Sequence, residues 1–161
     1  MTPPDASTPE LHPDVAELGF LLGTWAGQGE GRYPTIAPFA YGEEIRVWHV
    51  GKPFLAYVQR TWSLGDGRPL HGEAGYWRRS SGGVELVIAH PTGIVEVDEG
   101  GVEGTHLMVS STAVVGTSSA KAVAQVVRQV DVEGSDLTYR VSMAAVGQPL
   151  QEHLRARLVR V

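Results

Sequence analysis

The chain contains no cysteine among its 161 residues. That absence excludes disulfide bonds, zinc sites built on thiolates, iron–sulfur clusters, thiolate-ligated haem and a cysteine nucleophile. A metal ion bound by this chain would therefore need histidine, aspartate or glutamate as its protein ligands.

The chain also lacks an excess of positive charge and a long hydrophobic run. Its formal net charge is −5 and its pI is near 5.6, which argues against a broad basic surface for nucleic acid. Charged residues or glycines interrupt every apolar segment, so none reaches the roughly 18 apolar residues that a membrane helix needs. The N-terminus has no basic segment followed by an apolar run, as a secretory signal would. We expect a soluble cytoplasmic protein with no nucleic-acid or membrane partner.

The length fits one domain that is large enough to fold around a continuous core. We expect residues 1–13 to form a disordered N-terminal lead and residues 14–161 to form the folded domain. At the start of this domain, Asp14 is a candidate helix N-cap. Apolar residues at helical spacing after it predict one or two helical turns that end near Leu22.

Most of the remaining chain alternates short extended runs with strong turn signals. One run surrounds Trp25, and the others cover residues 43–50, 54–62, 70–79, 84–90, 94–98, 102–110, 122–132, 137–144 and 150–161. Residues 32–41 contain two prolines and predict a lid-like loop, and Glu99-Gly-Gly101 predicts a turn. About ten strands joined by hairpin-length turns predict an all-β fold. The most favoured architecture is an antiparallel up-and-down β-barrel of the lipocalin or fatty-acid-binding type, wide enough for a small ligand.

The strand around Trp25 is rich in glycine. Gly23, Gly27 and Gly29 lie on the same strand face as the indole of Trp25. Missing side chains there allow sharp curvature or the close approach of another group. The spacing differs from that of nucleotide-binding loops, and no Gly-Lys-Ser/Thr follows. The pattern by itself indicates a bend in a barrel wall.

No local motif marks a catalytic site. The six histidines include no i, i+4 pair and no H-x-H, so local spacing does not predict a multi-histidine metal site, although distant strands could bring histidines together. Glu43 and Glu44 point to opposite faces of a strand, and the serines lack the context of a nucleophile elbow.

A single histidine, His153, lies early in the last predicted strand, and histidine is a common iron ligand. Regular alternation places His153 on the same face as Arg155 and Arg157. If His153 points inward, either the two arginines also enter the barrel or a β-bulge shifts the register after the histidine.

Four segments occur in a telling order along residues 17–160. They are Gly23-Thr-Trp-Ala-Gly-Gln-Gly29, then Tyr33-Pro-Thr-Ile-Ala-Pro-Phe39 with Tyr41-Gly-Glu-Glu44, then Thr92-Gly-Ile-Val-Glu96, and finally Met143 with Gln148-Pro-Leu-Gln-Glu-His-Leu154. Together they resemble the nitrobindin family of haem-binding β-barrels. The resemblance implies a ten-stranded barrel with one haem b at one mouth and His153 as the proximal iron ligand.

The resemblance assigns roles to further residues. Thr35 and Ile36 match the loop that covers the haem, and Lys121 matches a basic residue near the haem edge, where its ammonium could pair with a propionate. The glycine motif of the family falls on Gly23, Trp25, Gly27 and Gly29.

The function implied by the resemblance is isomerisation of peroxynitrite to nitrate on ferric haem, together with nitric oxide binding to ferrous haem. Nitric oxide and peroxynitrite are then the small-molecule partners. The alternative is a lipocalin-like carrier of an apolar small molecule, which barrel topology alone supports equally. A barrel without any ligand is a third hypothesis. A homodimer is compatible with the sequence, which does not fix the oligomeric state.

Overall fold

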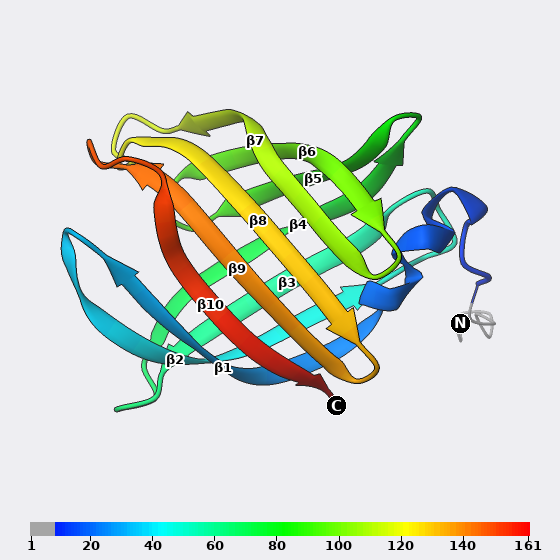
Figure 1. Ribbon diagram of the computed structural model, residues 1–161, viewed down its shortest axis with the longest axis horizontal. Helices are drawn as coiled ribbons and strands as arrows, with labels where there is room; N and C mark the ends of the chain where they lie inside the picture. The colour runs from blue at the N-terminus through cyan, green and yellow to red at the C-terminus, as the bar shows by residue number, and fades with distance from the viewer. Residues whose placement is uncertain (1–8) are drawn as a thin grey trace, which may run out of the picture.

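Ten antiparallel strands close into a barrel in the computed structural model, which describes residues 9–161 (Figure 1). The strands are β1 (Gly23–Tyr33), β2 (Ile36–Trp48), β3 (Leu55–Ser63), β4 (Pro69–Ser80), β5 (Gly83–His90), β6 (Ile94–Glu103), β7 (His106–Gly116), β8 (Val123–Glu133), β9 (Asp136–Ala145) and β10 (Gln151–Arg160). Each strand pairs with its neighbours in sequence, and β1 pairs with β10 to close the barrel. The predicted up-and-down β-barrel is confirmed. No helix among the described residues is long and apolar enough to cross a membrane.

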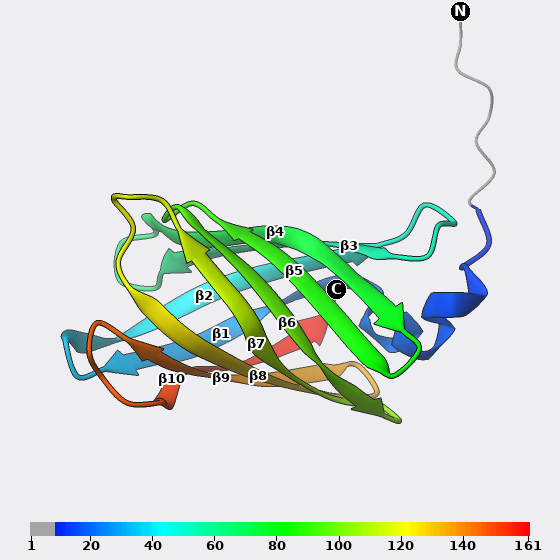
Figure 2. The ribbon, with the colours of Figure 1, turned by 90° about the horizontal axis from the view of Figure 1, so that it is seen from above.

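The two ends of the barrel differ (Figures 1 and 2). A 3₁₀ helix, η1 (Pro13–Leu21), lies at one end, close to the β8–β9 turn. The turns β1–β2, β3–β4, β7–β8 and β9–β10 lie at the opposite end, which we term the mouth. Because sequential antiparallel strands alternate in direction, the β5–β6 turn belongs to the mouth as well.

Apolar side chains of η1 fill the end opposite the mouth. Val15 and Leu18 are fully buried, Leu21 is almost so, and all three pack in one hydrophobic core with Trp25 of β1. The Trp25 indole donates a hydrogen bond from Nε1 to the Leu21 carbonyl oxygen at 2.9 Å, which satisfies its buried N–H. This end of the barrel is therefore closed by packed side chains.

The residue that caps η1 is His12, and the expectation of Asp14 as the cap is wrong. The Nδ1 atom of His12 accepts a hydrogen bond from the Asp14 backbone N–H at 3.2 Å. Of the predicted lead at residues 1–13, residues 1–8 lie outside the described part of the chain. Leu11, which also falls within the predicted lead, packs against the hydrophobic core. The boundary between the lead and the folded domain stays a prediction.

Residues 32–41 form a β-hairpin, which corrects the expectation of a lid-like loop. β1 continues to Tyr33, β2 begins at Ile36, and the turn is Pro34-Thr35. The register between the two strands shifts after Gly31, and Pro38 of β2 lies within the shifted stretch. A β-bulge tolerates a proline that a regular ladder would exclude.

The predicted turn at Glu99-Gly-Gly101 is also wrong, because β6 runs through these residues to Glu103. Gly100 lies against the neighbouring strand, and a Cβ atom there would come within 2.7 Å of the Val109 Cα atom. The turn is formed at Gly104, whose φ of +59° lies in the left-handed region that glycine adopts without strain. One glycine thus permits close strand contact, and the other makes the turn.

The glycines of β1 also permit close contact. A Cβ atom at Gly27 would overlap the Arg157 carbonyl oxygen and lie 2.7 Å from the Leu158 Cα atom, both in the backbone of β10. A Cβ atom at Gly29 would overlap the ring of Tyr41. These positions therefore require glycine for packing of the barrel wall.

We predict that Gly27→Val destabilises the protein by at least about 1–3 kcal/mol, the usual cost of overpacking, because the β10 backbone cannot move away without breaking strand pairing. Gly101→Val is the matched control, since a Cβ atom at Gly101 meets nothing within 4 Å. Chemical denaturation of both variants measures the difference. Equal stability of the two variants would show that Gly27 is incidental to the closure of the barrel.

Candidate functional site

A β-bulge in β10 determines how His153 is presented. Ser142 and Val141 are consecutive residues of β9, and they pair with Glu152 and Leu154 of β10. His153 therefore lies between the two pairs as the extra residue of the bulge.

The bulge decides between the two alternatives left open by the alternation of residues. Arg155 and Arg157 lie outside the barrel, where their side chains are 53% and 72% exposed. Arg157 pairs there with Asp136 at 3.0 Å. On the other face, Leu158 is fully buried and Leu154 packs against the core. The register shift thus separates His153 from the arginines.

Two contacts fix the imidazole of His153. Its Nδ1 atom lies 3.0 Å from the carbonyl oxygen of Arg32. A carbonyl oxygen can only accept, so Nδ1 carries the proton and Nε2 keeps its lone pair. The ring also packs edge-on against Tyr33, with ring centroids 5.3 Å apart. The histidine is held in the tautomer that presents Nε2 to a metal ion.

Tyr33 connects the two hairpins on either side of this bulge. Its hydroxyl group accepts a hydrogen bond from the Ala145 backbone N–H at 2.9 Å and donates to the Met143 carbonyl oxygen at 3.1 Å. These bonds join β1 to β9 past β10, where the bulge interrupts regular pairing. The sequence segment that begins at Tyr33 supported the family resemblance, but nothing in it indicated this bridging role.

The other residues predicted for the site lie at the mouth, in two separate places. Thr35 lies in the exposed β1–β2 turn, and Ile36, which is 46% exposed, is the first residue of β2. Both follow closely after Arg32, whose carbonyl oxygen contacts His153. Lys121 is exposed in the β7–β8 loop. It lines an open cleft of about 470 Å³, whose lining does not include His153.

The glycine motif extends away from the mouth. Gly23 begins β1 at the plugged end of the barrel, and Trp25 packs beside η1. The motif residues therefore shape the wall and the closed end, whereas Thr35, Ile36 and His153 belong to the open end.

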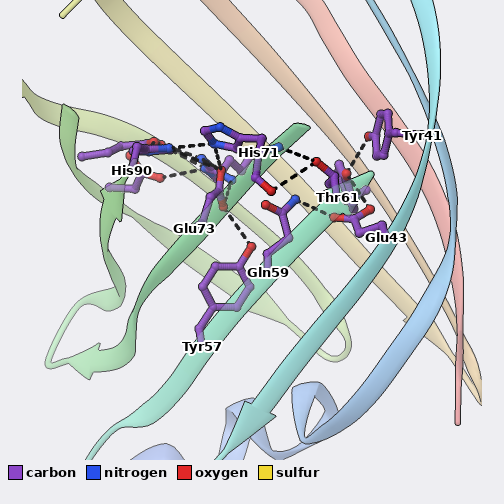
Figure 3. Close-up of polar contacts among 12 residues, drawn as sticks. Tyr41, Glu43, Tyr57, Gln59, Thr61, His71, Glu73 and His90 are labelled. Carbon is purple, nitrogen blue, oxygen red and sulfur yellow. Dashed lines mark hydrogen bonds and ion pairs between the residues drawn. The ribbon is translucent and has the colours of Figure 1, made fainter. Parts of the chain in front are cut away.

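A buried polar cluster crosses the barrel interior (Figure 3). Its centre is Arg128 of β8. The guanidinium donates to both carboxylate oxygens of Glu73 on β4, at 3.0 and 3.2 Å, and to both oxygens of Glu96 on β6, at 2.9 and 3.0 Å. Asp98 of β6 is a third carboxyl group, with an oxygen 3.4 Å from Nε of Arg128. One cation thus faces three buried carboxyl groups.

Because one guanidinium faces three carboxyl groups, the pKa values of Glu73 and Glu96 shift in one direction and that of Asp98 shifts in the other. Burial disfavours the charged form of Glu73 and Glu96, but the adjacent Arg128 holds the pKa of both below the usual range. Burial, together with the negative charge of Glu96, raises the pKa of Asp98 to about 8. Neither oxygen of Asp98 accepts a hydrogen bond from residues 9–161, which agrees with a protonated carboxyl group at neutral pH.

Two histidines converge on this cluster from neighbouring strands. Nε2 of His71 on β4 lies 3.2 Å from Nδ1 of His90 on β5, and Nε2 of His90 lies 2.8 Å from an oxygen of Glu96. Burial lowers the pKa of His71, although the negative charge of Glu73 opposes this shift.

A second group of polar side chains surrounds Glu43. Gln59 donates to one carboxylate oxygen of Glu43 at 2.6 Å, and the Tyr139 hydroxyl donates to the other at 2.8 Å. Burial raises the pKa of Glu43 to about 7. The neighbouring Glu44 lies on the outer face beside Arg60, at 3.2 Å, so the expectation that Glu43 and Glu44 point to opposite faces is confirmed.

Little space remains inside the barrel below the polar cluster. The enclosed cavity there measures about 50 Å³ and is lined by residues such as Leu21, Tyr57 and Glu73. Sites for drug-sized ligands or cofactors usually measure about 300–1,000 Å³. This cavity is therefore too small for a ligand as large as haem.

Comparison with known proteins identifies the family. The model of the "THAP4-like, heme-binding beta-barrel domain" matches residues 14–160. The chain belongs to this family. The resemblance to the nitrobindins that was derived from the sequence segments is thereby confirmed.

Similar proteins support the same assignment. The chain is 51% identical to peroxynitrite isomerase 1 of Mycolicibacterium paratuberculosis over 94% of this chain and 97% of that protein. It is 47% identical to a protein of Arabidopsis thaliana named peroxynitrite isomerase Rv2717c, over 94% and 91% of the two chains. The crystal structure of Rv2717c from M. tuberculosis superposes with a TM-score of 0.88 at 46% identity, and the match covers 94% of this chain and 99% of that one.

The residues at the mouth fit a haem. The bulge, the Arg32 carbonyl oxygen and Tyr33 together hold an imidazole whose Nδ1 is engaged, so that Nε2 is the atom available to iron. Neutral histidine is the usual protein ligand of haem iron in globins and peroxidases, and a chain without cysteine offers no thiolate in its place.

We predict that the pKa of Glu43 makes stability depend on pH. The folded protein retains the Glu43 proton up to about pH 7, whereas the unfolded chain releases it near its ordinary pKa of 4.5. Folding stability contributed by this group is therefore present at low pH and lost as the pH rises from about 4.5 to about 7. Relative to Glu43→Gln, wild type should lose roughly 3 kcal/mol across this window.

Denaturant titrations at several pH values measure this difference. Glutamine at position 43 still accepts from Gln59, and its amide can donate to the Tyr139 hydroxyl, so the variant should fold. Glu44→Gln is the control, because Glu44 lies outside the barrel next to Arg46 and Arg60. A plot of its free energy of unfolding against pH should run parallel to that of wild type. Parallel curves for wild type and Glu43→Gln would contradict the raised pKa of Glu43.

Proposed function

We propose that this protein binds one haem b per chain through Nε2 of His153 and isomerises peroxynitrite to nitrate in the ferric state. In the ferrous state it would bind nitric oxide. The observation that carries the proposal is the contact between Nδ1 of His153 and the Arg32 carbonyl oxygen, because it selects the tautomer in which Nε2 can bind iron. The names of the relatives in Mycolicibacterium paratuberculosis and Arabidopsis thaliana support the reaction.

The protein's part in this reaction is to hold and expose the cofactor. When bound, ferric haem supplies a Lewis-acidic iron with an open position for a peroxynitrite oxygen. The Arg32 carbonyl oxygen and the ring of Tyr33 keep the imidazole of His153 in one orientation. Thr35 and Ile36 would cover the haem from the β1–β2 hairpin, and Lys121 would pair with a propionate at the rim.

The rearrangement of peroxynitrite to nitrate conserves all atoms and charge, so it consumes no proton overall. No protein acid or base is then strictly required. This suits a chain in which the sequence shows no catalytic triad, nucleophile elbow or carboxylate pair. The role of the barrel is to position the cofactor rather than to carry out proton transfer.

A lipocalin-like carrier is the second candidate, and the interior argues against it. A carrier encloses its apolar ligand inside the barrel, yet here η1 fills one end and charged side chains cross the middle. The remaining enclosed space of about 50 Å³ is well below the usual size of about 300 Å³ or more for a ligand site.

We predict that His153→Ala binds hemin more weakly and gives an altered Soret band, because the variant lacks the imidazole nitrogen that would bind iron. The ferric wild-type protein should accelerate peroxynitrite decay with nitrate as the main product, whereas the apoprotein and the variant should not. Hemin titrations monitored by absorption, and stopped-flow decay with nitrate analysis, measure the two effects.

The control for this experiment is His106→Ala, since His106 lies on the outside of β7 in contact with Asp131. Its Soret band and decay rate should equal those of wild type. An unchanged Soret band in His153→Ala would refute His153 as the ligand. Equal decay with and without haem would refute the isomerase activity and leave only haem binding.

Lys121 is predicted to contribute little to affinity. An exposed ion pair is worth about 0–1 kcal/mol, so Lys121→Ala should weaken hemin binding by no more than about fivefold, and increasingly less as salt is added. Hemin titrations at low and high ionic strength measure this effect. Complete loss of binding in this variant would contradict a solvent-exposed propionate at the mouth.

A further inference from the structure

His71, Glu73 and His90 bring three potential metal-ligand atoms together inside the barrel, apart from His153. The atoms are Nε2 of His71, Nδ1 of His90 and Oε1 of Glu73, and they come from β4 and β5. We propose that these three side chains form a binding site for a divalent first-row transition-metal ion of the Zn²⁺, Co²⁺ or Fe²⁺ type, separate from the haem ligand.

The spacing of the three atoms suits a single ion. The two nitrogens are 3.2 Å apart, and the Glu73 oxygen is 3.9 Å from the His71 nitrogen and 3.8 Å from the His90 nitrogen. Ligand atoms at about 2.0–2.2 Å from one ion are about 3–4 Å from each other. An ion can thus be bound without large backbone movement. Figure 3 shows the labelled side chains of His71, Glu73 and His90 gathered on one side of the polar cluster.

Contacts with Glu96 and Arg128 orient His90 and Glu73 for metal binding. Nε2 of His90 donates to a Glu96 carboxylate oxygen at 2.8 Å, which leaves Nδ1 of His90 without a proton. A carboxylate partner of this kind orients a histidine and makes it a stronger metal ligand. Arg128 fixes both Glu73 and Glu96. In the absence of metal, Nε2 of His71 donates its proton to Nδ1 of His90, and a metal ion would replace that proton.

The charge of the cluster favours an added cation. Arg128 is the only Lys or Arg side chain paired with Glu73, Glu96 and Asp98 among residues 9–161. With Glu73 and Glu96 ionised and Asp98 protonated, the negative charges exceed the positive charge by one. A divalent ion would offset this surplus and favour release of the Asp98 proton, which distinguishes the cluster from an ordinary buried ion pair.

The chemistry of the ligands limits the kind of ion. Two imidazoles and one carboxylate are a set used for Zn²⁺ in hydrolases and for Fe²⁺ in oxygenases, with positions left open for other ligands. Mg²⁺ and Ca²⁺ prefer oxygen ligands and should bind poorly. The His71 side chain is 33% exposed, whereas that of His90 is 10% exposed, so an ion would enter past His71.

Titration of the haem-free protein with Co²⁺ tests the site, because Co²⁺ bound by nitrogen ligands has visible absorption. Wild type should bind one Co²⁺ per chain, Zn²⁺ should displace it, and Mg²⁺ should not. His71→Ala and His90→Ala should each weaken binding by more than about 100-fold. Glu96→Gln should weaken it about 10–100-fold, as expected for a residue that orients a ligand.

His153→Ala and His106→Ala are the controls, and both should bind Co²⁺ as wild type does. Undiminished binding in both His71→Ala and His90→Ala, loss of binding in His153→Ala, or no binding by wild type would each overturn the proposal. Circular dichroism checks that the variants fold. If the variants do not fold, NMR spectra of the wild-type protein with Zn²⁺ provide the test. The ring signals of His71 and His90 should shift when Zn²⁺ is added. Shifts confined to other histidines would refute the site. Hemin binding by His90→Ala tests the haem proposal independently.

Discussion

The interior of the barrel depends on the guanidinium of Arg128. It reaches from β8 to carboxylates on β4 and β6, so it joins three strands that are not neighbours in the barrel wall. Removal of one partner from a buried ion pair typically costs about 3–5 kcal/mol, since the remaining charge stays buried without compensation. Here the loss of Arg128 would leave two buried carboxylates, Glu73 and Glu96, with only their hydrogen bonds to Tyr57 and His90 among the described residues. The positions of His90 and His71 follow from this pairing, because His90 is held by Glu96 and His71 by His90.

This polar cluster divides the barrel into two unlike ends. Toward η1 the side chains are apolar and tightly packed around Trp25, and toward the mouth the walls end in turns and a bulge. A barrel of ten strands is wide enough to enclose a ligand, but the packed end and the cluster use most of that width. The proposed haem site therefore lies at the mouth, where the bulge carries His153.

The sequence predicts the barrel better than it predicts the interior. Turn signals and period-two runs are local, so they reveal ten strands, although they misplace the turn at Glu99-Gly-Gly101 and miss the hairpin at residues 32–41. A glycine that permits strand contact and a glycine that forms a turn look alike in sequence. The meeting of His71 and His90 depends on the stagger between β4 and β5. No local pattern encodes that stagger, and this is why their convergence was left open.

His153 and His90, the histidines proposed to bind haem iron and a divalent cation, differ in the hydrogen-bond acceptor of their imidazole rings. Each has one ring nitrogen bound to an acceptor and the other nitrogen left for a metal. The acceptor of His153 is a neutral backbone carbonyl, whereas the acceptor of His90 is the carboxylate of Glu96, which draws the N–H proton more strongly and makes the imidazole a better electron donor. A neutral acceptor suits an iron whose charge the porphyrin already offsets, and an anionic acceptor suits a bare divalent cation beside Arg128. The difference in acceptor, rather than the histidine itself, therefore separates the proposed haem ligand from the proposed cation ligands.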